Sequence, residues 1–223
     1  AITMGDGNDS VTIGASALGT GGSVDAGDGT ADTMTMTIAN ANAASANGTF
    51  ETTISGFERL SISNSAGTNS VDLANLDDIN YVTSAGTSGT YTINNASSGF
   101  NLIQTAAATT GYTVALADSS ATTDAITYKL TNAADTAGGT LTANSIETIA
   151  IESDDTAAVD NSTIDHTLTL SADSVTALTL TGDASLTLTN TSTTLTSVDA
   201  SGMTDNFNWT TGNLAAAATI TGG

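Results

Sequence analysis

The sequence predicts an all-β protein with the character of a parallel β-helix or β-roll, and three observations support this fold class. Threonine alternates with aliphatic residues along the whole chain, Gly, Asn, Asp and Ser interrupt the alternation at short intervals, and Lys, Arg, Glu and Gln are scarce. A period of two places the aliphatic side chains on one face of a strand and the threonines on the other. We therefore expect short Thr-rich strands, with a β-sandwich-like arrangement as the alternative for the middle part.

Short strands are expected from one end of the chain to the other. The clearest alternating runs are Met34–Ile38, Leu168–Leu170, Leu178–Leu180 and Leu186–Leu188. After Asp173 the predicted strands are closely spaced and cover Val175–Leu180, Leu186–Thr189 and Leu195–Val198. This spacing fits the turns of a parallel coil or meandering strands of a sandwich. Two weak helix candidates, for which a loop is the alternative, are Asn40–Ala46 and Asn213–Ala218.

A longer recurrence links two distant segments. Gly56–Ile62 and Ser145–Ile151 share a small residue, an apolar residue, a glutamate and two further apolar positions in the same order. The recurrence predicts either two related modules or two equivalent edges of one coil, with both glutamates pointing outward. We expect one elongated β-domain over residues 1–223, with 1–110 and 111–223 as alternative sub-modules. The sequence starts within a strand and without Met, which we interpret as a piece of a longer chain.

Charge is the strongest compositional signal. Asp and Glu number 23 against two basic residues, Arg59 and Lys129, which gives a net charge of −21. Two like charges 4 Å apart repel by about 4 kcal/mol at an effective dielectric of about 20, so clustered aspartates need counter-ions from solution. Such a chain repels nucleic acid and anionic lipid, and divalent cations or further copies of itself are the expected partners. No apolar stretch is long enough to span a bilayer.

The sharpest local motif is a Gly-Asp turn that occurs twice near the N-terminus. Gly5–Val11 fits a calcium-binding nonapeptide, and Ala26–Met34 is a partial second copy with an additional Ala31. Glycines let the backbone turn its carbonyls inward, and aspartate supplies a hard anionic oxygen, the donor type that Ca²⁺ prefers. The predicted ligand positions are Gly5, Asp6, Gly7, Asn8, Asp9, Asp25, Gly27, Asp28, Gly29, Thr30 and Asp32.

Each such turn is half a site, because in calcium-binding rolls the cation lies between neighbouring turns. The two copies are expected to share an ion if the segment between Val11 and Val24 brings them into register. Met4 and Ala26 stand where the motif has its leading glycine, and ordinary Gly-Asp turns are the alternative interpretation.

A second candidate calcium site follows a predicted strand that ends at Ile151 and Glu152. Asp154 and Asp155 come directly after it, with Asp160 close by in the sequence. Solvated loop charges are an equally good interpretation of these aspartates.

The sequence offers little for catalysis. His166 is the single imidazole, and although Asp165 precedes it, its place in a Thr/Ile/Leu strand favours a packed or surface side chain over a catalytic one. There is no Cys, so a structural zinc site lacks its ligands. One Trp and four Tyr are few for a carbohydrate site. We therefore predict that the protein is not an enzyme.

Several segments resemble one family in the same order along the chain. Residues Met4–Ile13 and Leu18–Thr30 resemble the C-terminal β-rich region of the RTX-type calcium-binding surface-layer (S-layer) proteins of Gram-negative bacteria. Further matching segments are Gly56–Leu60, Ile146–Ile149, Thr181–Thr191 and Thr196–Ser201. The resemblance implies a secreted β-protein that is exported by a type I system and folds outside the cell with calcium.

From these observations and this resemblance we expect a calcium-dependent structural protein that self-assembles into a bacterial extracellular surface layer or filament. Its expected partners are copies of itself and, through a part outside this chain, a cell-surface polysaccharide. The alternatives are an RTX-type adhesin or biofilm-matrix module that binds a glycan or another surface, and a secreted β-helix polysaccharide hydrolase.

Overall fold

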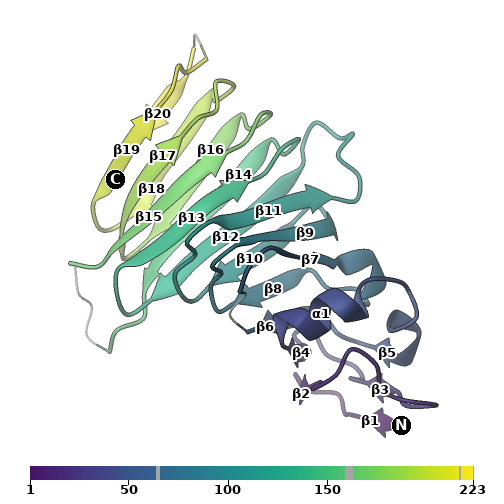
Figure 1. Ribbon diagram of the computed structural model, residues 1–223. Coiled ribbons are helices and arrows are strands. Elements are labelled where there is room, and N and C mark those ends of the chain that lie inside the picture. The colour runs from purple at the N-terminus through teal and green to yellow at the C-terminus, as the bar shows by residue number, and fades with distance from the viewer. Residues whose placement is uncertain (64–65, 159–162, 216, 223) are drawn as a thin grey trace.

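The computed structural model describes residues 1–63, 66–158, 163–215 and 217–222. The chain winds into a β-solenoid whose strands pair in parallel from turn to turn (Figure 1). This confirms the predicted all-β, β-helix fold class. Among the described residues, no helix is long and apolar enough to cross a membrane.

Successive turns of the coil contribute strands to sheets that run along its length. The longest sheet has ten strands, in the order β2 (Ser10–Thr12), β4 (Thr33–Met36), β6 (Arg59–Ile62), β8 (Tyr81–Ser84), β10 (Phe100–Gln104), β12 (Ala125–Asn132), β14 (Thr148–Asp155), β16 (Ala177–Gly182), β18 (Ser197–Met203) and β20 (Thr219–Thr221). The second sheet has seven strands, in the order β19 (Phe207–Thr211), β17 (Ser185–Asn190), β15 (Asp165–Ser171), β13 (Thr136–Thr142), β11 (Gly111–Leu116), β9 (Thr90–Ala96) and β7 (Asn69–Asp72).

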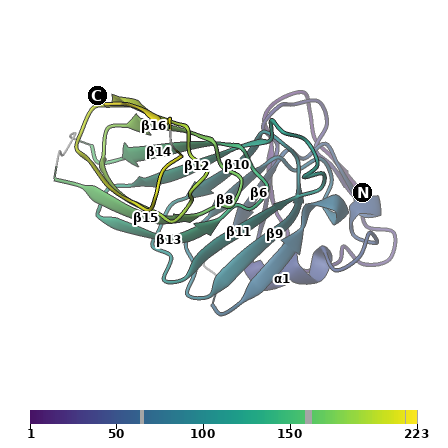
Figure 2. The same cartoon turned by 90° about the horizontal axis from the view of Figure 1, so that it is seen from above.

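A short third sheet forms in the first turns of the coil, separate from the seven-stranded sheet. It consists of β1 (Ile2–Thr3), β3 (Val24–Asp25) and β5 (Ile54–Ser55). Even-numbered and odd-numbered strands thus form opposite walls of the coil, as Figure 2 shows from above. The middle part, for which a sandwich was the alternative, follows the same parallel pattern, because β8, β10, β12 and β14 pair in parallel one after the other.

The core lies between the two walls and follows from the period-two pattern. In β4, β6 and β8 every second side chain is buried, and Leu186 and Leu188 of β17 are fully buried. Three tyrosines also lie inside: Tyr91 and Tyr112 contact edge to face with ring centroids 6.4 Å apart, and Tyr128 lies 6.3 Å from Tyr112. Outward-facing threonines and inward-facing aliphatic residues therefore produce the coil as the alternation predicts.

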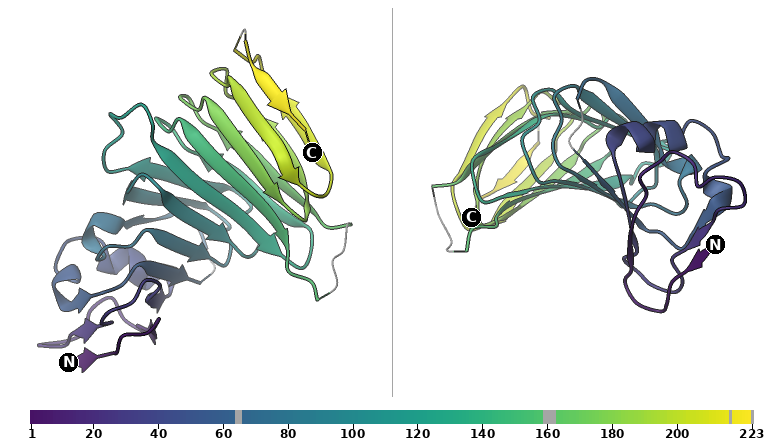
Figure 3. Two further views of the ribbon diagram at one scale, coloured as in Figure 1. Left: turned by 180° about the vertical axis from the view of Figure 1, so that it is seen from behind. Right: turned by 60° about the horizontal axis from the view of Figure 1, so that its bottom comes forward.

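The predicted strands beyond Asp173 form, with shifted ends, as β16, β17 and β18. The first helix candidate is α1 (Ile38–Ala44), which starts two residues earlier than expected because the Thr37 hydroxyl accepts a hydrogen bond from Asn40 N. Helix α1 packs against β7 at the N-terminal turns, with Ile38, Ala41 and Ala44 buried in the core (Figure 3). Two single 3₁₀ turns follow, η1 (Glu51–Thr53) and η2 (Leu73–Asn75). No helix forms in the described residues of 213–218.

One edge of the coil carries both Gly-Asp turns. We call it the first corner; it is where the chain passes from an odd-numbered strand to the next even-numbered strand. In the described residues it consists of 4–9, 26–32, 56–58, 73–80, 97–99, 117–124, 143–147, 172–176, 191–196, 212–215 and 217–218. The recurring glutamates Glu58 and Glu147 both lie here, directly before β6 and β14. The recurrence therefore marks two equivalent edges of one coil.

Candidate metal centre

The two Gly-Asp turns lie on top of each other at the first corner. Residues 4–9 join β1 to β2, and residues 26–32 join β3 to β4. Ile2 pairs with Val24 before the turns, and Ser10 pairs with Thr33 after them. The intervening segment therefore brings the two copies into adjacent, aligned turns, which is the condition for an ion to be shared between them.

The carboxylate of Asp32 lies at the centre of this stack. Its side chain is completely buried, and its Oδ1 accepts a hydrogen bond of 2.6 Å from Asp9 N on the preceding turn. Its own N–H donates to Glu58 Oε2 on the following turn at 2.9 Å. The second carboxylate oxygen, Oδ2, has no hydrogen-bond partner. A buried polar atom without a partner costs about 1–3 kcal/mol, and more if it is charged, so this oxygen calls for a cation or a proton.

A backbone carbonyl approaches the same space. A Cβ atom built on Gly29 would lie 2.3 Å from Asp32 Oδ2 and 2.7 Å from Gly7 O. The neighbouring Gly27 has a φ of +88°, and a Cβ there would lie 2.3 Å from Gly5 O. Glycine is thus required because the turns approach each other too closely for a side chain. The anionic oxygen of Asp32 and the carbonyl oxygen of Gly7 form a set of hard donors that fits Ca²⁺.

The remaining predicted ligands of the two turns have other contacts or are exposed. Asp9 Oδ2 accepts from Gly5 N at 3.2 Å, and Asn8 Oδ1 accepts from Thr30 N at 3.4 Å. Asp25 Oδ1 accepts from Gly27 N at 3.2 Å and from the Ser55 hydroxyl at 3.0 Å.

Asp6 and Asp28 are exposed at the turn surface. Across the described ranges no three acidic or histidine side chains gather at metal-binding distance. Backbone carbonyls and water would therefore complete the coordination of an ion held by Asp32.

The second candidate site has a different arrangement. Lys129 of β12 lies opposite Glu152 of β14, and its Nζ contacts Glu152 Oε1 at 2.9 Å and also Asp154 Oδ2. Asp155 Oδ1 instead accepts from Ala157 N at 2.6 Å. Asp154 thus has a protein counter-charge, and the structure does not bring either aspartate to the stacked Gly-Asp turns. Asp160 lies outside the described residues.

Other carboxylates hold successive turns together, and the sequence analysis did not select them for this role. Each accepts a hydrogen bond from a backbone N–H about one turn away: Asp77 from Phe57, Glu147 from Asp124, Asp173 from Ser145, Asp183 from Asp155 and Asp135 from Asp165. Burial raises the pKa of Asp77, whereas the bond from Ser145 N lowers the pKa of Asp173. These N–H groups lie at corners or, for Asp155 and Asp165, at the ends of strands, where the carboxylates supply the acceptor. The donor and the acidic acceptor of each pair lie 20 to 30 positions apart, about one turn of the coil, and this spacing was the sequence signal that could have identified them.

Of the two positions expected for His166, packed or at the surface, the structure shows the packed one. Its ring is fully buried, Nδ1 lies 3.1 Å from the Ser153 hydroxyl, and Nε2 has no partner. Burial lowers its pKa. Asp165 donates its backbone N–H to Asp135, and no hydrogen bond joins its carboxylate to the imidazole among the described contacts. The geometry is that of a structural histidine.

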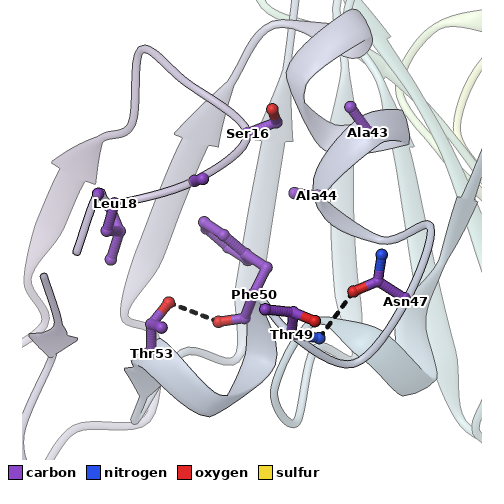
Figure 4. Close-up of a pocket in the computed structure, with 10 residues that line it drawn as sticks. Ser16, Leu18, Ala43, Ala44, Asn47, Thr49, Phe50 and Thr53 are labelled. Atoms are coloured by element: carbon purple, nitrogen blue, oxygen red, sulfur yellow. Dashed lines mark hydrogen bonds between the residues drawn. The ribbon is translucent and has the colours of Figure 1, made fainter. Parts of the chain in front are cut away.

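A separate groove lies between the loop that holds Leu18 and the segment around α1 (Figure 4). Its volume is about 290 Å³, and Phe50 and Leu18 face it. Thr53 donates to Phe50 O at 2.6 Å at its edge. None of its ten lining residues carries an acid, a base or an imidazole, so the groove offers no acid–base chemistry.

Fold and site together define a parallel β-solenoid with two stacked Gly-Asp turns around a buried carboxylate. No family model matches this chain, and no curated protein matches it.

Proposed function

We propose that this protein is a calcium-dependent structural protein whose copies assemble into a bacterial extracellular layer or filament. The observation that supports it best is the Asp32 carboxylate, which is buried between two stacked Gly-Asp turns with Oδ2 unpartnered and Gly7 O beside it.

Calcium would act first on folding. Without a cation, the charge of Asp32 is buried without compensation, and 23 acidic residues face only two basic ones. A bound Ca²⁺ neutralises the carboxylate and links residues 4–9 to residues 26–32, so its binding free energy stabilises the folded coil. Extracellular calcium modules have dissociation constants of about 10⁻⁴ to 10⁻³ M. Such affinities are compatible with a protein that folds after secretion.

Calcium would act second on assembly. At a net charge of −21 two copies repel each other, and the repulsion extends over a Debye length of about 8 Å at physiological ionic strength. Divalent cations between surface carboxylates remove this repulsion. The resemblance of residues 4–13 and 18–30 to RTX-type surface-layer proteins supports the same assignment, together with secretion by a type I system and attachment to a cell-surface polysaccharide through another part of the protein.

The test uses the full chain and its Asp32→Asn variant. Asparagine keeps an oxygen that accepts from Asp9 N but replaces the anionic Oδ2 by an amide nitrogen, so it removes the proposed ligand with little change of shape. We expect far-UV circular dichroism and particle size of the wild type to change between millimolar calcium and excess chelator, with a much higher calcium requirement for the variant.

Asp6→Asn is the matched control, because Asp6 is exposed on the preceding Gly-Asp turn. Magnesium in place of calcium tests whether the site prefers the larger ion, because Ca²⁺ accepts an irregular coordination shell and Mg²⁺ requires an octahedral one. Unchanged folding and assembly of the wild type in excess chelator would refute the proposal.

A further inference from the structure

Asp124 is a second buried carboxylate at the first corner. It is the last residue before β12, it is 3% exposed, and its Oδ2 has no hydrogen-bond partner. The chain offers no basic side chain to compensate it, since Lys129 pairs with Glu152 and Asp154 and Arg59 lies over the Tyr81 ring at 4.4 Å. The carboxylate therefore requires either a proton or a cation from solution.

The surroundings of Asp124 repeat those of Asp32. Asp124 N donates to Glu147 Oε2 at 3.0 Å, and Asp32 N donates to Glu58 Oε2 at 2.9 Å. The carbonyl of Asp124 accepts from Thr148 N at 2.9 Å, just as the carbonyl of Asp32 accepts from Arg59 N at 3.0 Å. Both aspartates directly precede a strand of the ten-stranded sheet, and both leave Oδ2 buried without a partner.

A third oxygen comes from the preceding turn. The Ser98 hydroxyl accepts from Ala125 N at 3.1 Å. The turns before and after Asp124 thus each place one oxygen at this point of the backbone, Ser98 Oγ at Ala125 N and Glu147 Oε2 at Asp124 N. The segment 117–123 that leads into Asp124 is exposed, which gives backbone carbonyls and water access to the site.

We propose that Asp124 and Glu147, with Ser98, form a second cation site that takes a hard divalent cation of the size of Ca²⁺. Two carboxylates and a hydroxyl favour hard, oxygen-seeking cations over Zn²⁺ and Cu²⁺, for which nitrogen and sulfur ligands are better donors. Exposed loop oxygens and water suit the irregular six- to eightfold coordination of Ca²⁺ better than the strict octahedron of Mg²⁺. The recurrence of Gly56–Ile62 as Ser145–Ile151 then reflects a repeated ion site, since it contains the two glutamates. This inference extends the proposed calcium dependence but rests on different residues, so either can fail alone.

The test is a calorimetric calcium titration of the full chain and four variants: Asp124→Asn, Asp32→Asn, Glu147→Gln and Asp118→Asn. Asp118 is an exposed aspartate of the same segment that bonds Ser120, and it serves as the matched control. We expect Asp124→Asn to lose one class of calcium sites, with binding at least about 100-fold weaker, because even outer-shell partners of a metal contribute 10- to 100-fold. Asp32→Asn should leave that class intact, and the control should bind like the wild type.

Glu147→Gln keeps an oxygen that accepts from Asp124 N and loses only the charge. We expect it to weaken calcium binding at the same class of sites, which keeps the test decisive even if Asp124→Asn folds poorly. Calcium binding by Asp124→Asn and Glu147→Gln with wild-type number and affinity overturns the proposal. Loss of binding in Asp32→Asn alone would retain the proposed function and remove only this second site.

Discussion

Gly29→Ala tests the geometry of the stacked turns most directly. A Cβ at Gly29 would lie 2.3 Å from Asp32 Oδ2 and 2.7 Å from Gly7 O, both far inside van der Waals contact. Gly29 has no positive φ, so the substitution adds the methyl group without a backbone penalty. Gly5→Ala is the matched control on the other turn, because a Cβ at Gly5 meets nothing within 4 Å.

The expected magnitude follows from the overlap. Forcing an additional methyl group into a tightly packed site typically costs about 1–3 kcal/mol. The methyl overlaps the Asp32 carboxylate and the Gly7 carbonyl, so this cost falls on the folded coil, the state that calcium would bind. Since about 1.4 kcal/mol corresponds to a factor of ten, we expect calcium affinity to fall by roughly 5- to 150-fold. Gly5→Ala should change it by less than about twofold.

The assay is a calcium titration followed by far-UV circular dichroism, with the midpoint concentration as the readout. Calorimetry of the same variants separates loss of binding from loss of folding. Equal midpoints for Gly29→Ala, Gly5→Ala and the wild type would show that the space beside Asp32 Oδ2 is not where calcium binds.

Three further predictions concern the core, the ion pairs and the buried histidine. Leu188→Ala should lower the free energy of unfolding by about 2–5 kcal/mol because Leu188 is fully buried, whereas Thr189→Ala on the exposed face of the same strand should change it by less than about 0.5 kcal/mol; urea unfolding measures both. Lys129→Met should cost less than about 1 kcal/mol in 0.15 M salt, and the loss should shrink further in 1 M salt, because the pairs with Glu152 and Asp154 are partly exposed. Burial lowers the pKa of His166 in the folded state, so the unfolded chain takes up a proton first as the pH falls below about 6.5; stability should drop by up to about 1.4 kcal/mol per pH unit until the folded-state pKa is reached. His166→Gln should flatten this part of the stability curve, and an unchanged slope between pH 5 and 7 would contradict the burial argument.

The fold class could be predicted from the sequence because the signal is local. Alternation of threonine with aliphatic residues determines which side chains face the core, and the pattern can be recognised in a strand as short as β17. The stacked Gly-Asp turns were also predictable, since their glycines and aspartates are close together in the sequence. The position of α1 was missed by two residues because its Thr37 cap lies outside the apparent helical run.

The contacts between turns could not be predicted in this way. The Asp124–Glu147 bond spans 23 positions and the Asp165–Asp135 bond spans 30, because corners of different length separate the strands. The pairing of Lys129 with Asp154 depends on the register of β12 against β14, which no local pattern encodes. For the same reason nothing in the sequence distinguishes Asp32 and Asp124, which are buried, from Asp6 and Asp28, which are exposed.

The carboxylate contacts at the first corner all point the same way along the chain. Asp9 donates to Asp32, Asp32 donates to Glu58, and Asp124 donates to Glu147, so each earlier turn depends on an acceptor from the turn that follows it. The backbone-to-carboxylate bonds of the first corner therefore have a polarity: the N–H donor lies on the earlier turn and the acidic acceptor on the later one. Removing a turn should leave these N–H groups of its N-terminal neighbour without their acceptors, whereas the neighbour on its C-terminal side keeps the acceptors that it receives from the next turn.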